Sequence, residues 1–426
     1  MDTKREDINI DDRKPRAILV GVQLGPQDIS YFMKELEQLA EAAGLEVAGI
    51  LTQRAERVNP ASYMGSGKLE ELKEACETLE ADVVVLNNEL SGRQIRNIEE
   101  ETGVKVIDRT ILILDIFASR AVSREGKLQV ELAQLQYRMP RLVGFGKSLS
   151  RTGGGIGTRG PGEKKLETDR RHIARKMDEI RREIEEVKAS RAIQRSKREK
   201  SELPIVAIVG YTNAGKSTLM NAMLAATEKE EKSVFAKDML FATLDTALRN
   251  IKADTDKEFL LIDTVGFVSN LPHTLVNAFR STLEEILYAD LILHVVDSSY
   301  EDYFFNMNVT DHVVNEIGAE DIKKLYVFNK IDKVENYEDV LPGGPDCLYI
   351  SAKKGLNLDK LMDRICKELF SDRITAELLI PYDKGQISSY LCEKCKVLKM
   401  DYKNEGTYFE VELSKADYGR YKEYLI

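Results

Sequence analysis

The residues whose types and spacing most clearly specify chemistry lie between positions 210 and 218. They follow an apolar run, 203–209, and open a stretch with helical character. A strand that ends in a glycine-containing loop before a helix lets backbone N–H groups converge on phosphate oxygens, with the positive end of the helix behind them. Lys216 then reaches the terminal phosphates, and the Ser217 hydroxyl can bind Mg²⁺. The predicted phosphate loop comprises Gly210, Tyr211, Thr212, Asn213, Ala214, Gly215, Lys216, Ser217 and Thr218.

A second group of residues predicts that the bound base is guanine. Guanine presents its N1–H and its 2-amino group side by side, so the carboxylate of Asp332 can accept from both. Asn329 can donate to the acceptor edge of the base, and the stem of Lys330 can pack on its ring. Residues 329–332 and 351–353 each follow an apolar strand of an open α/β sheet. Together these two groups favour GTP over ATP as the bound nucleotide. The residues assigned to the base are Asn329, Lys330, Ile331 and Asp332, supported by Ser351, Ala352 and Lys353.

A third segment predicts a part of the site that responds to the nucleotide. It follows the apolar run 259–262 and consists of Asp263, Thr264, Val265 and Gly266. The carboxylate can hold Mg²⁺ through water, and the Gly266 N–H can contact the γ-phosphate. Since only GTP offers that contact, the segment is a predicted switch. Phe267 stands where many GTPases carry a glutamine that orients water, which a phenylalanine cannot do.

Two polar residues allow more than one interpretation. Thr243 is the candidate for the second hydroxyl on Mg²⁺, and the alternative is an ordinary threonine at the start of a strand. Asn213 could help a monovalent cation such as K⁺ to offset developing negative charge; equally, it could serve only because asparagine tolerates the turn. The segment around Thr243 that is assigned to GTP comprises Phe241, Ala242, Thr243, Leu244 and Asp245. The predicted catalytic residues are Lys216, Thr243 and Gly266, and the predicted Mg²⁺ ligands are Ser217, Thr243 and, through water, Asp263.

Composition limits the class of protein. A length of 426 residues suggests about three domains, and a hydrophobic content of 43% is ample for buried cores. The charged N-terminus has no apolar segment of the kind found in signal peptides, and no run approaches the ~20 apolar residues that span a bilayer. Five scattered cysteines are typical of the reduced cytosol. We therefore expect a soluble, cytoplasmic protein without membrane insertion. Cys392 and Cys395 have the spacing of half a zinc site, but no second pair accompanies them.

Charge is distributed unevenly along the chain. The net charge is −10, yet residues 141–200 contain 18 Lys and Arg against 9 Asp and Glu, so this stretch is at +9 and the rest at −19. A basic region in an acidic chain indicates local contact with a polyanion, where lysine and arginine replace the counterions of phosphates. The alternative is a solvated helix with paired charges four residues apart.

Two apolar seams predict a helical hairpin in this region. One seam consists of Ile173, Met177, Ile180, Ile184 and Val187, and a matching seam upstream consists of Leu128, Leu132, Leu135 and Met139. Steps of 4, 3, 4 and 3 residues in the first seam and of 4, 3 and 4 in the second place each set on one helix face, so antiparallel pairing is expected. The connector, 140–162, is too long for a simple turn and ends in a glycine-rich string. We interpret it as a tip that contacts folded RNA through Arg141, Lys147, Arg151 and Arg159.

Flanking these regions are two smaller predicted domains. Short apolar runs alternate with helical stretches from about residue 16 to 106, which predicts an α/β domain. After residue 372 the pattern is strand, helix, two strands and helix. The predicted domains are 1–108 (α/β), 109–200 (basic coiled-coil hairpin), 201–372 (GTP-binding) and 373–426 (α+β). The expected fold is α/β, with a P-loop GTPase domain between the hairpin and the short C-terminal domain.

Four strings in the chain resemble the HflX family of translation-associated GTPases within the Obg-like group. They are SYMGSGKLEEL at 62–72, GGGIGTRGPGE at 153–163, GYTNAGKST at 210–218 and FATLD at 241–245. The resemblance implies binding to the large ribosomal subunit and its rRNA, entry of the basic tip near the peptidyl-transfer region, and GTP-dependent splitting or rescue of ribosomes. It also implies a hydrophobic residue at the water-orienting position, as Phe267 shows, and a C-terminal extension of variable form.

From this resemblance we expect a monomeric GTPase that hydrolyses GTP slowly alone and faster on the ribosome. One alternative is a regulatory GTPase that acts on protein partners and uses the hairpin as a dimerisation arm. Another is an RNA-modifying GTPase in which Cys392 or Cys395 performs chemistry, although no second substrate pocket is visible in the sequence.

Overall fold

The structure is a computed structural model that describes residues 13–26, 28–141, 161–199, 203–227, 241, 247–254, 257–269, 283–371 and 373–426, with the side chains of the helix at 161–199 described from 167 to 189. The chain divides into two compact units, which are treated separately. The first consists of Met1–Lys188 with Met239–Phe241 and Asn270–Ala278, and the second contains the remaining residues.

The first unit contains a parallel sheet of four strands. Its order is β2-β1-β3-β4, formed by β1 (Arg16–Leu24), β2 (Glu46–Ala55), β3 (Val83–Leu86) and β4 (Lys105–Asp108). On one face, Ile18 and Val20 of β1 share a core with α2 (Ser66–Thr78) and α3 (Gly92–Thr102). The helices α1 (Ser30–Ala42) and α4 (Arg109–Arg120) complete the domain and contact each other. Three strands lie within two residues of the apolar runs at 17–22, 83–86 and 104–107, whereas β2 begins at the predicted residue 46 and continues four residues beyond the predicted end at 51.

A buried ion pair joins α1 to α4. Arg109 donates from Nη2 to Glu35 Oε2 at 2.5 Å and from Nη1 to Asn87 Oδ1 at 3.1 Å, with both charged side chains about 5% exposed or less. Charged groups are seldom buried unless a partner compensates for the lost hydration. The two partners come from α1 and from the residue that follows β3, and together they fix the start of α4 at the end of β4.

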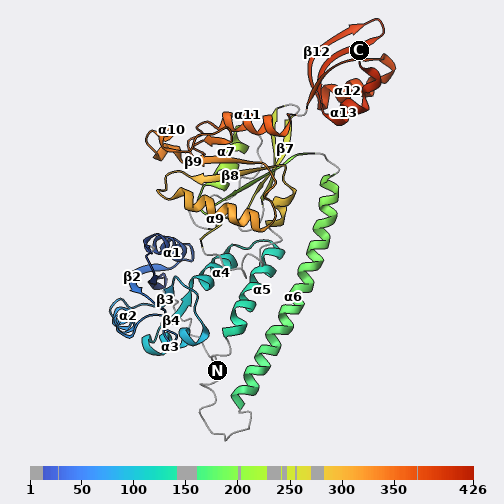
Figure 1. Ribbon diagram of the computed structural model, residues 1–426. Helices are drawn as coiled ribbons and strands as arrows, with labels where there is room; N and C mark the ends of the chain where they lie inside the picture. Colours follow the sequence, from blue (N-terminus) through green and yellow to red (C-terminus); the bar gives the residue numbers. More distant parts are fainter. Residues whose placement is uncertain are drawn as a thin grey trace, which may run out of the picture. The chain divides into compact units, whose positions relative to one another are not determined.

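The predicted hairpin is present as α5 (Arg124–Arg141) and α6 (Pro161–Glu199). Lys176 pairs with Glu131, and Arg124 pairs with Glu183 at 2.8 Å. The pairs advance by seven residues on α6 while they retreat by seven on α5, so the helices are antiparallel (Figure 1). The seam residues Met177, Ile180 and Ile184 are buried.

On α5 the most buried face is not the predicted seam. Val130, Ala133 and Tyr137 are buried, whereas Leu128 and Leu132 are only partly so. Val130, Ala133 and Tyr137 are spaced three and four residues apart, which places them on one helix side, and the packing of α5 against α4 and α3 explains their burial. The predicted seam on α5 therefore describes one face of this helix, and a second face, buried against α3 and α4, was not predicted.

The second unit contains a six-stranded sheet in the order β10-β9-β8-β5-β7-β6. Its strands are β5 (Ile205–Gly210), β6 (Ala247–Asp254), β7 (Lys257–Asp263), β8 (Leu291–Asp297), β9 (Lys324–Asn329) and β10 (Cys347–Tyr349), all parallel except the antiparallel edge strand β6. The order reverses around β5, so the loop after β5 lies at a topological switch point, where α/β proteins bind ligands.

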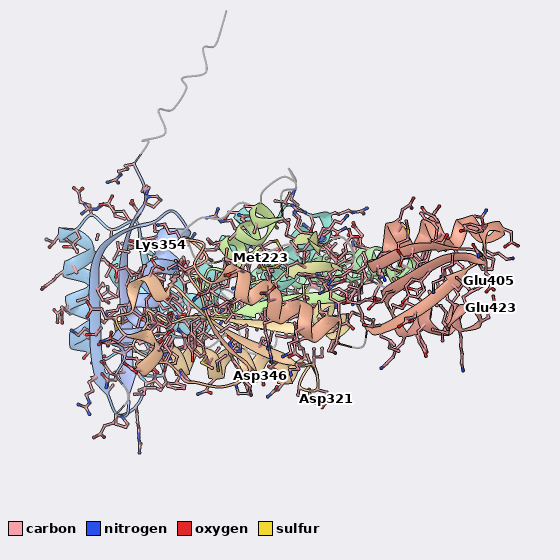
Figure 2. The ribbon with its side chains drawn as sticks, turned by 90° about the horizontal axis from the view of Figure 1, so that it is seen from above. Met223, Asp321, Asp346, Lys354, Glu405 and Glu423 are labelled. Carbon is pink, nitrogen blue, oxygen red and sulfur yellow. The ribbon has the colours of Figure 1, made fainter. Side chains whose placement is uncertain are left out.

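Helices cover both faces of this sheet (Figure 1). The helices α7 (Lys216–Ala226) and α11 (Leu358–Leu369) share one core with β5 and β8, and Met223 of α7 is fully buried there (Figure 2). On the other face, α9 (Tyr303–Glu316) packs with η2 (Glu284–Tyr288) against β5. The remaining short elements are η3 (Ile331–Lys333) and α10 (Tyr337–Val340). This is the doubly covered α/β domain that the sequence predicts.

The C-terminal residues form an antiparallel sheet in the order β11-β13-β12, made of β11 (Ile374–Ile380), β12 (Lys396–Lys403) and β13 (Gly406–Leu413). The helices α12 (Gly385–Lys394) and α13 (Lys415–Arg420), with the turns η4 (Tyr382–Lys384) and η5 (Lys422–Tyr424), complete this domain, and Glu405 and Glu423 in Figure 2 belong to it. These observations confirm the predicted fold class, while the predicted domain boundaries remain predictions.

Two features are absent from the described ranges, a membrane-spanning helix and a cluster of metal-binding side chains. No helix among them combines the length and the apolar character needed to cross a membrane. Nor do any three His, Cys, Asp or Glu side chains in those ranges form a group that could hold a metal ion. Cys395 is buried at the end of α12 and Cys392 is exposed.

Candidate nucleotide site

The phosphate loop takes its shape from the strands on either side of it. Gly210, the last residue of β5, has a φ of 154°, and a Cβ placed there would lie 2.2 Å from the carbonyl oxygen of Val295 in β8. A side chain at this position would therefore collide with backbone that cannot move without disturbing the sheet. The first glycine of the motif is required by the neighbouring strand as well as by the turn.

Lys216 is held inside the loop that it follows. Its Nζ donates to the carbonyl oxygens of Gly210 at 3.0 Å and Tyr211 at 2.9 Å, and the residue is 6% exposed. Burial lowers the pKa of the ammonium to about 8, against the opposing effect of the nearby Asp263 carboxylate. The loop thus fixes the position of a desolvated cation, which binds a polyphosphate more strongly than a cation in water would.

Oxygen ligands suited to magnesium meet at the start of α7. Ser217 Oγ donates to Asp263 Oδ2 at 2.7 Å, and Asp263 is fully buried at the end of β7. A hydroxyl and a carboxylate are hard oxygen ligands of the kind that Mg²⁺ prefers, usually with waters and substrate phosphates completing its shell. The donor set therefore fits Mg²⁺.

The third predicted ligand, Thr243, lies outside the described residues, as do Ala242, Leu244 and Asp245. Phe241 is described and belongs to the first unit. Its ring is buried, with its centroid 4.5 Å from that of Phe117 in α4. The structure thus places the side chain of Phe241 in an apolar contact.

The segment after β7 runs alongside the phosphate loop. A Cβ on Gly266 would lie 2.7 Å from Thr212 Cα and 2.9 Å from Lys216 Nζ, so only glycine fits against the lysine that is predicted to reach the terminal phosphates. The side chain of Phe267 is 2% exposed in an apolar cluster with Val209 and Ile286. Phe267 contributes packing rather than a polar group to this site.

Asn329 connects the two loops that are predicted to surround the base. Its Nδ2 donates to the carbonyl oxygen of Ala214 at 2.8 Å, and its Oδ1 accepts from the N–H of Ala352 at 2.9 Å. Both bonds are buried, so the asparagine joins the phosphate loop to the segment after β10. With its amide used in this way, Asn329 holds the two loops of the predicted base site in a fixed position relative to each other.

Asp332 is the carboxylate that is predicted to bind the guanine edge. It accepts from Ser351 Oγ at 2.6 Å and lies 3.7 Å from Lys354 Nζ, with its side chain 12% exposed (Figure 2 labels Lys354). The hydroxyl of Ser351, ahead of a smaller contribution from Lys354, lowers the pKa of Asp332 below its usual value. The group is therefore ionised and acceptor-only at neutral pH, as pairing with two adjacent N–H donors requires.

Asp297 contacts Lys330 of the predicted base site, although it belongs to none of the predicted nucleotide motifs. It ends β8 and accepts from Lys330 Nζ at 2.7 Å and from Ser299 Oγ at 2.6 Å. Lys330 also donates to the carbonyl oxygen of Asn213 at 2.8 Å. The signal was present in the sequence, because Asp297 closes the apolar run 291–296 in the same way as Asp263 closes its own strand.

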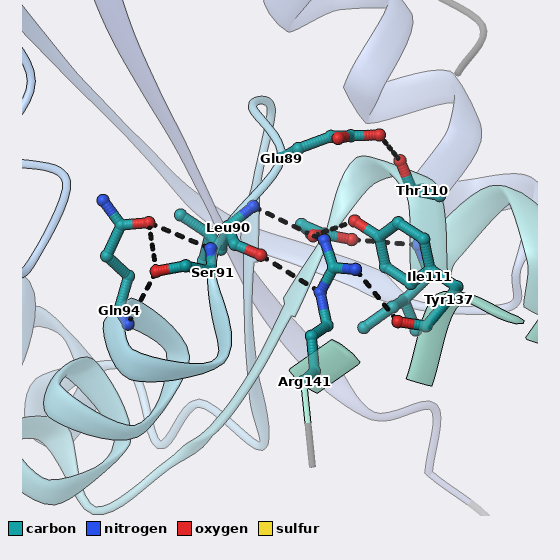
Figure 3. Close-up of polar contacts among 9 residues, drawn as sticks. Glu89, Leu90, Ser91, Gln94, Thr110, Ile111, Tyr137 and Arg141 are labelled. Atoms are coloured by element: carbon teal, nitrogen blue, oxygen red, sulfur yellow. Dashed lines mark hydrogen bonds and ion pairs between the residues drawn. The ribbon is translucent and has the colours of Figure 1, made fainter. Parts of the chain in front are cut away.

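Arg141 is the only predicted RNA contact within the described ranges, since Lys147, Arg151 and Arg159 lie outside them. Its guanidinium donates to the carbonyl oxygens of Leu90 and Tyr137, each at 3.0 Å, and lies over the Tyr137 ring (Figure 3). It also lies 3.5 Å from the fully buried carboxylate of Asp108. The structure thus places Arg141 in a network that anchors the end of α5.

The doubly covered sheet and the phosphate loop at its switch point define a P-loop nucleotide-binding protein, and the prediction that Asp332 binds guanine makes GTP the expected nucleotide. Comparisons with known proteins agree. Three family models match, described as the N-terminal region of a GTP-binding GTPase (30–118), its middle region (120–198) and a 50S ribosome-binding GTPase (205–330).

Curated relatives narrow this class. The chain is 48% identical over 414 residues to the GTPase HflX of Caldanaerobacter subterraneus subsp. tengcongensis, covering 97% of this chain and 94% of that one. It is 38% identical to the GTPase HflX of Escherichia coli, with 96% of each chain covered. Among solved structures, a Sulfolobus solfataricus GTP-binding protein in complex with GDP is 26% identical, with a TM-score of 0.45 and coverage of 84% and 98%. The chain belongs to the HflX family of GTPases.

Proposed function

We propose that this GTPase binds the large ribosomal subunit and, in its GTP state, splits or rescues ribosomes. The proposal is carried by the presence of a predicted GTP site and a basic helical hairpin in the same chain. The GTP-binding region of this chain matches a family model described as a 50S ribosome-binding GTPase. GTP would order the segment that contains Gly266, the ordered protein would bind rRNA, and hydrolysis would release it. Ribosomes are cytoplasmic, so the protein would act there, as a monomer.

The distribution of charge along the hairpin supports contact at its tip. Residues 167–189 contain equal numbers of basic and acidic side chains, so the +9 of the region comes from 141–166, at +5, and from 190–200, at +4. In the balanced part, Arg181 pairs with Asp178 at 2.7 Å and Lys188 with Glu185 at 3.0 Å. The middle of α6 is therefore the solvated, charge-paired helix of the alternative interpretation, and the unbalanced positive charge belongs to its ends.

The site residues support roles in binding and hydrolysis. Ser217 and, through water, Asp263 would hold Mg²⁺, which would neutralise charge on the β- and γ-phosphates. Thr243 would complete that set, and Asp332 would select guanine. Asn213 remains a candidate ligand for a potassium ion. Its left-handed backbone, with a φ of 60°, agrees equally with the alternative that asparagine is present only because it tolerates the turn.

Slow intrinsic hydrolysis follows from the packing of Phe267. Because its side chain is buried away from polar partners, it cannot orient the attacking water. A partner that completes the site would accelerate hydrolysis, since catalysis of phosphoryl transfer depends on positioned polar groups. We infer that the ribosome supplies this completion.

The proposal is tested by co-sedimentation with intact ribosomes and isolated subunits in a non-hydrolysable GTP analogue or GDP at moderate salt. We expect pelleting with the large subunit, and loss of intact particles, only with the GTP analogue. Equal absence of binding in both nucleotides would refute the proposal. The double variant Arg151→Ala/Arg159→Ala should bind GTP normally but pellet less.

The matched control is Arg171→Ala/Arg181→Ala. It removes the same charge from the middle of α6, where both side chains are at least half exposed and face acidic partners. Equal loss in both double variants would show a nonspecific effect of charge and contradict the tip assignment.

The dimerisation-arm alternative is less well supported. Met177, Ile180 and Ile184 are buried within their own chain, where the ion pairs to α5 fix the antiparallel arrangement. An apolar seam that is already covered offers little surface to a second copy. A homodimer insensitive to salt, without co-sedimenting RNA, would restore that alternative.

A further inference from the structure

Tyr211 binds the segment that is predicted to sense the γ-phosphate. Its phenolic oxygen accepts from the backbone N–H of Ser269 at 2.6 Å. Ser269 is fully buried and Tyr211 is 7% exposed, so the bond is shielded from water. It therefore links the second residue of the phosphate loop to a residue three positions beyond Gly266.

Two backbone bonds bring the same segments together. The N–H of Phe267 donates to the carbonyl oxygen of Gly210 at 3.2 Å, and the N–H of Thr212 donates to the carbonyl oxygen of Phe267 at 2.7 Å. Tyr211 and Phe267 form an isolated parallel bridge. These bonds can form with almost any side chains, whereas the bond to Ser269 requires a hydroxyl at the reach of tyrosine from position 211.

The phosphate-loop motif does not specify this tyrosine. In G-x-x-x-x-G-K-[ST] the second position is free, because the loop binds phosphate through its backbone. A large side chain that is buried and hydrogen-bonded at a free position therefore needs a local reason. The reason is that Tyr211 contacts the stretch from Val265 to Ser269 through its hydroxyl and through the bridge at Phe267. All residues of that stretch that have side chains are buried.

We propose that Tyr211 is a positioning residue for GTP hydrolysis. Its hydroxyl fixes Ser269, the bridge at Phe267 fixes the middle of the segment, and Gly266 is thereby kept next to Lys216 Nζ at the terminal phosphate. GDP lacks the group that Gly266 contacts, so the tyrosine contributes to the GTP complex and to the hydrolytic step and not to the affinity for GDP.

The test compares Tyr211→Phe with the unchanged protein in the absence of ribosomes. The variant keeps the buried ring and removes only the hydroxyl. We expect the single-turnover rate of GTP hydrolysis and the preference for GTP over GDP to fall about three- to tenfold, the range that corresponds to one buried hydrogen bond. The affinity for GDP should stay within about twofold. The amide of Ser269 should exchange with deuterium faster, by about the same factor as the rate falls.

A matched control is Tyr337→Phe. This tyrosine lies in α10 of the same unit, and its hydroxyl donates to the neighbouring Glu338 at 3.4 Å in an exposed position. Its removal should change neither hydrolysis nor exchange at Ser269. Tyr211→Leu, which also removes the ring, should move the same quantities in the same direction as Tyr211→Phe.

Two results would overturn the proposal. An unchanged hydrolysis rate in Tyr211→Phe would show that Ser269 is held without the phenol. Equal loss of GTP and GDP affinity would show that Tyr211 shapes the phosphate loop itself. Both measurements are independent of ribosome binding. The role of Tyr211 can therefore be refuted while the proposed ribosomal function stands, and the ribosomal function can be refuted while the role of Tyr211 stands.

Discussion

Lys330 Nζ lies 2.7 Å from Asp297 Oδ2, so a residue at the end of β8 fixes a lysine that follows β9. The same ammonium donates to the carbonyl oxygen of Asn213 in the phosphate loop. One side chain therefore crosses from the predicted base site to the phosphate site, and its direction is set by a carboxylate that no nucleotide motif in the sequence contains. The two halves of the nucleotide site are thereby connected through a charge-assisted pair.

Replacement of Asp297 should weaken GTP and GDP to the same extent. Asp297→Asn removes the charge that orients Lys330 but keeps the side-chain shape, and we expect about a tenfold loss for each nucleotide, consistent with one charge-assisted bond. Titration with fluorescent GTP and GDP analogues measures this. A loss confined to GTP would place Asp297 at the γ-phosphate and contradict the structure.

Inosine triphosphate should bind about 10- to 100-fold more weakly than GTP, because it lacks the 2-amino group that Asp332 is predicted to bind. In Asp332→Asn the neutral amide no longer favours that donor, so the two nucleotides should bind with similar, low affinity. Competition binding with both proteins tests this. Retention of the full preference by the variant would remove Asp332 from the base site.

Nucleotide binding should take up a proton at alkaline pH. The folded protein begins to lose the Lys216 proton near its pKa of about 8, and phosphate binding favours the ammonium. Affinity should therefore fall as pH rises above about 8, by up to about tenfold per pH unit. Calorimetry at pH 9 in two buffers with different ionisation enthalpies should detect this uptake, which should vanish near pH 6.5.

The same group affects stability with a defined sign. Between about pH 8 and its ordinary pKa of 10.5, Lys216 binds fewer protons in the folded than in the unfolded protein. Its contribution to the free energy of unfolding therefore rises with pH across this window.

The substitution Gly266→Ala should weaken the binding of GTP but hardly change the binding of GDP. The added methyl group would meet Thr212 Cα and Lys216 Nζ at under 3 Å, so the segment must move away from the phosphate loop. GDP affinity should stay within about threefold, while the GTP preference and the hydrolysis rate fall at least about tenfold. Hydrolysis at the unchanged rate would show that Gly266 does not approach the terminal phosphate.

The buried pair Glu35–Arg109 should be important for the stability of the first unit. Glu35→Ala leaves the Arg109 guanidinium buried without its carboxylate, and we expect a loss of about 3–5 kcal/mol in the free energy of unfolding. Glu41→Ala, at an exposed position of the same helix, is the control and should cost less than about 0.5 kcal/mol. Denaturant unfolding followed by a probe in the first unit distinguishes the two variants.

The sequence predicted the parts of this protein that follow local rules. Strands β1, β5 and β9 were visible as apolar runs, and the phosphate loop was visible because its spacing reflects a backbone shape. The α5–α6 pairing was foreseen from matching seams. Contacts between distant segments, such as those of Tyr211 with Ser269 and Lys330 with Asp297, had no periodic signal and became visible only in three dimensions.

Arg141 illustrates the limit of an argument from charge. It belongs to a basic stretch, and charge alone suggested a contact with RNA. In the structure its guanidinium is used by Leu90, Tyr137 and Asp108. Composition does not distinguish an arginine that pairs within the protein from one that is available to a partner, because the difference depends on which carboxylates the fold places nearby.

The hydrogen bonds that join Leu90, Ile111 and Tyr137, labelled in Figure 3, to the carboxylate of Asp108 determine how the chain can be divided for experiments. The carboxylate of Asp108 accepts from the N–H groups of Leu90 and Ile111 and from the hydroxyl of Tyr137, whose pKa is raised by burial and by that carboxylate, so it stays a donor. A recombinant fragment that ends at residue 108 would keep the first of these donors and discard the other two. It would expose a carboxylate that is fully buried in the intact protein, so the smallest fragment worth expressing from this end extends through α5.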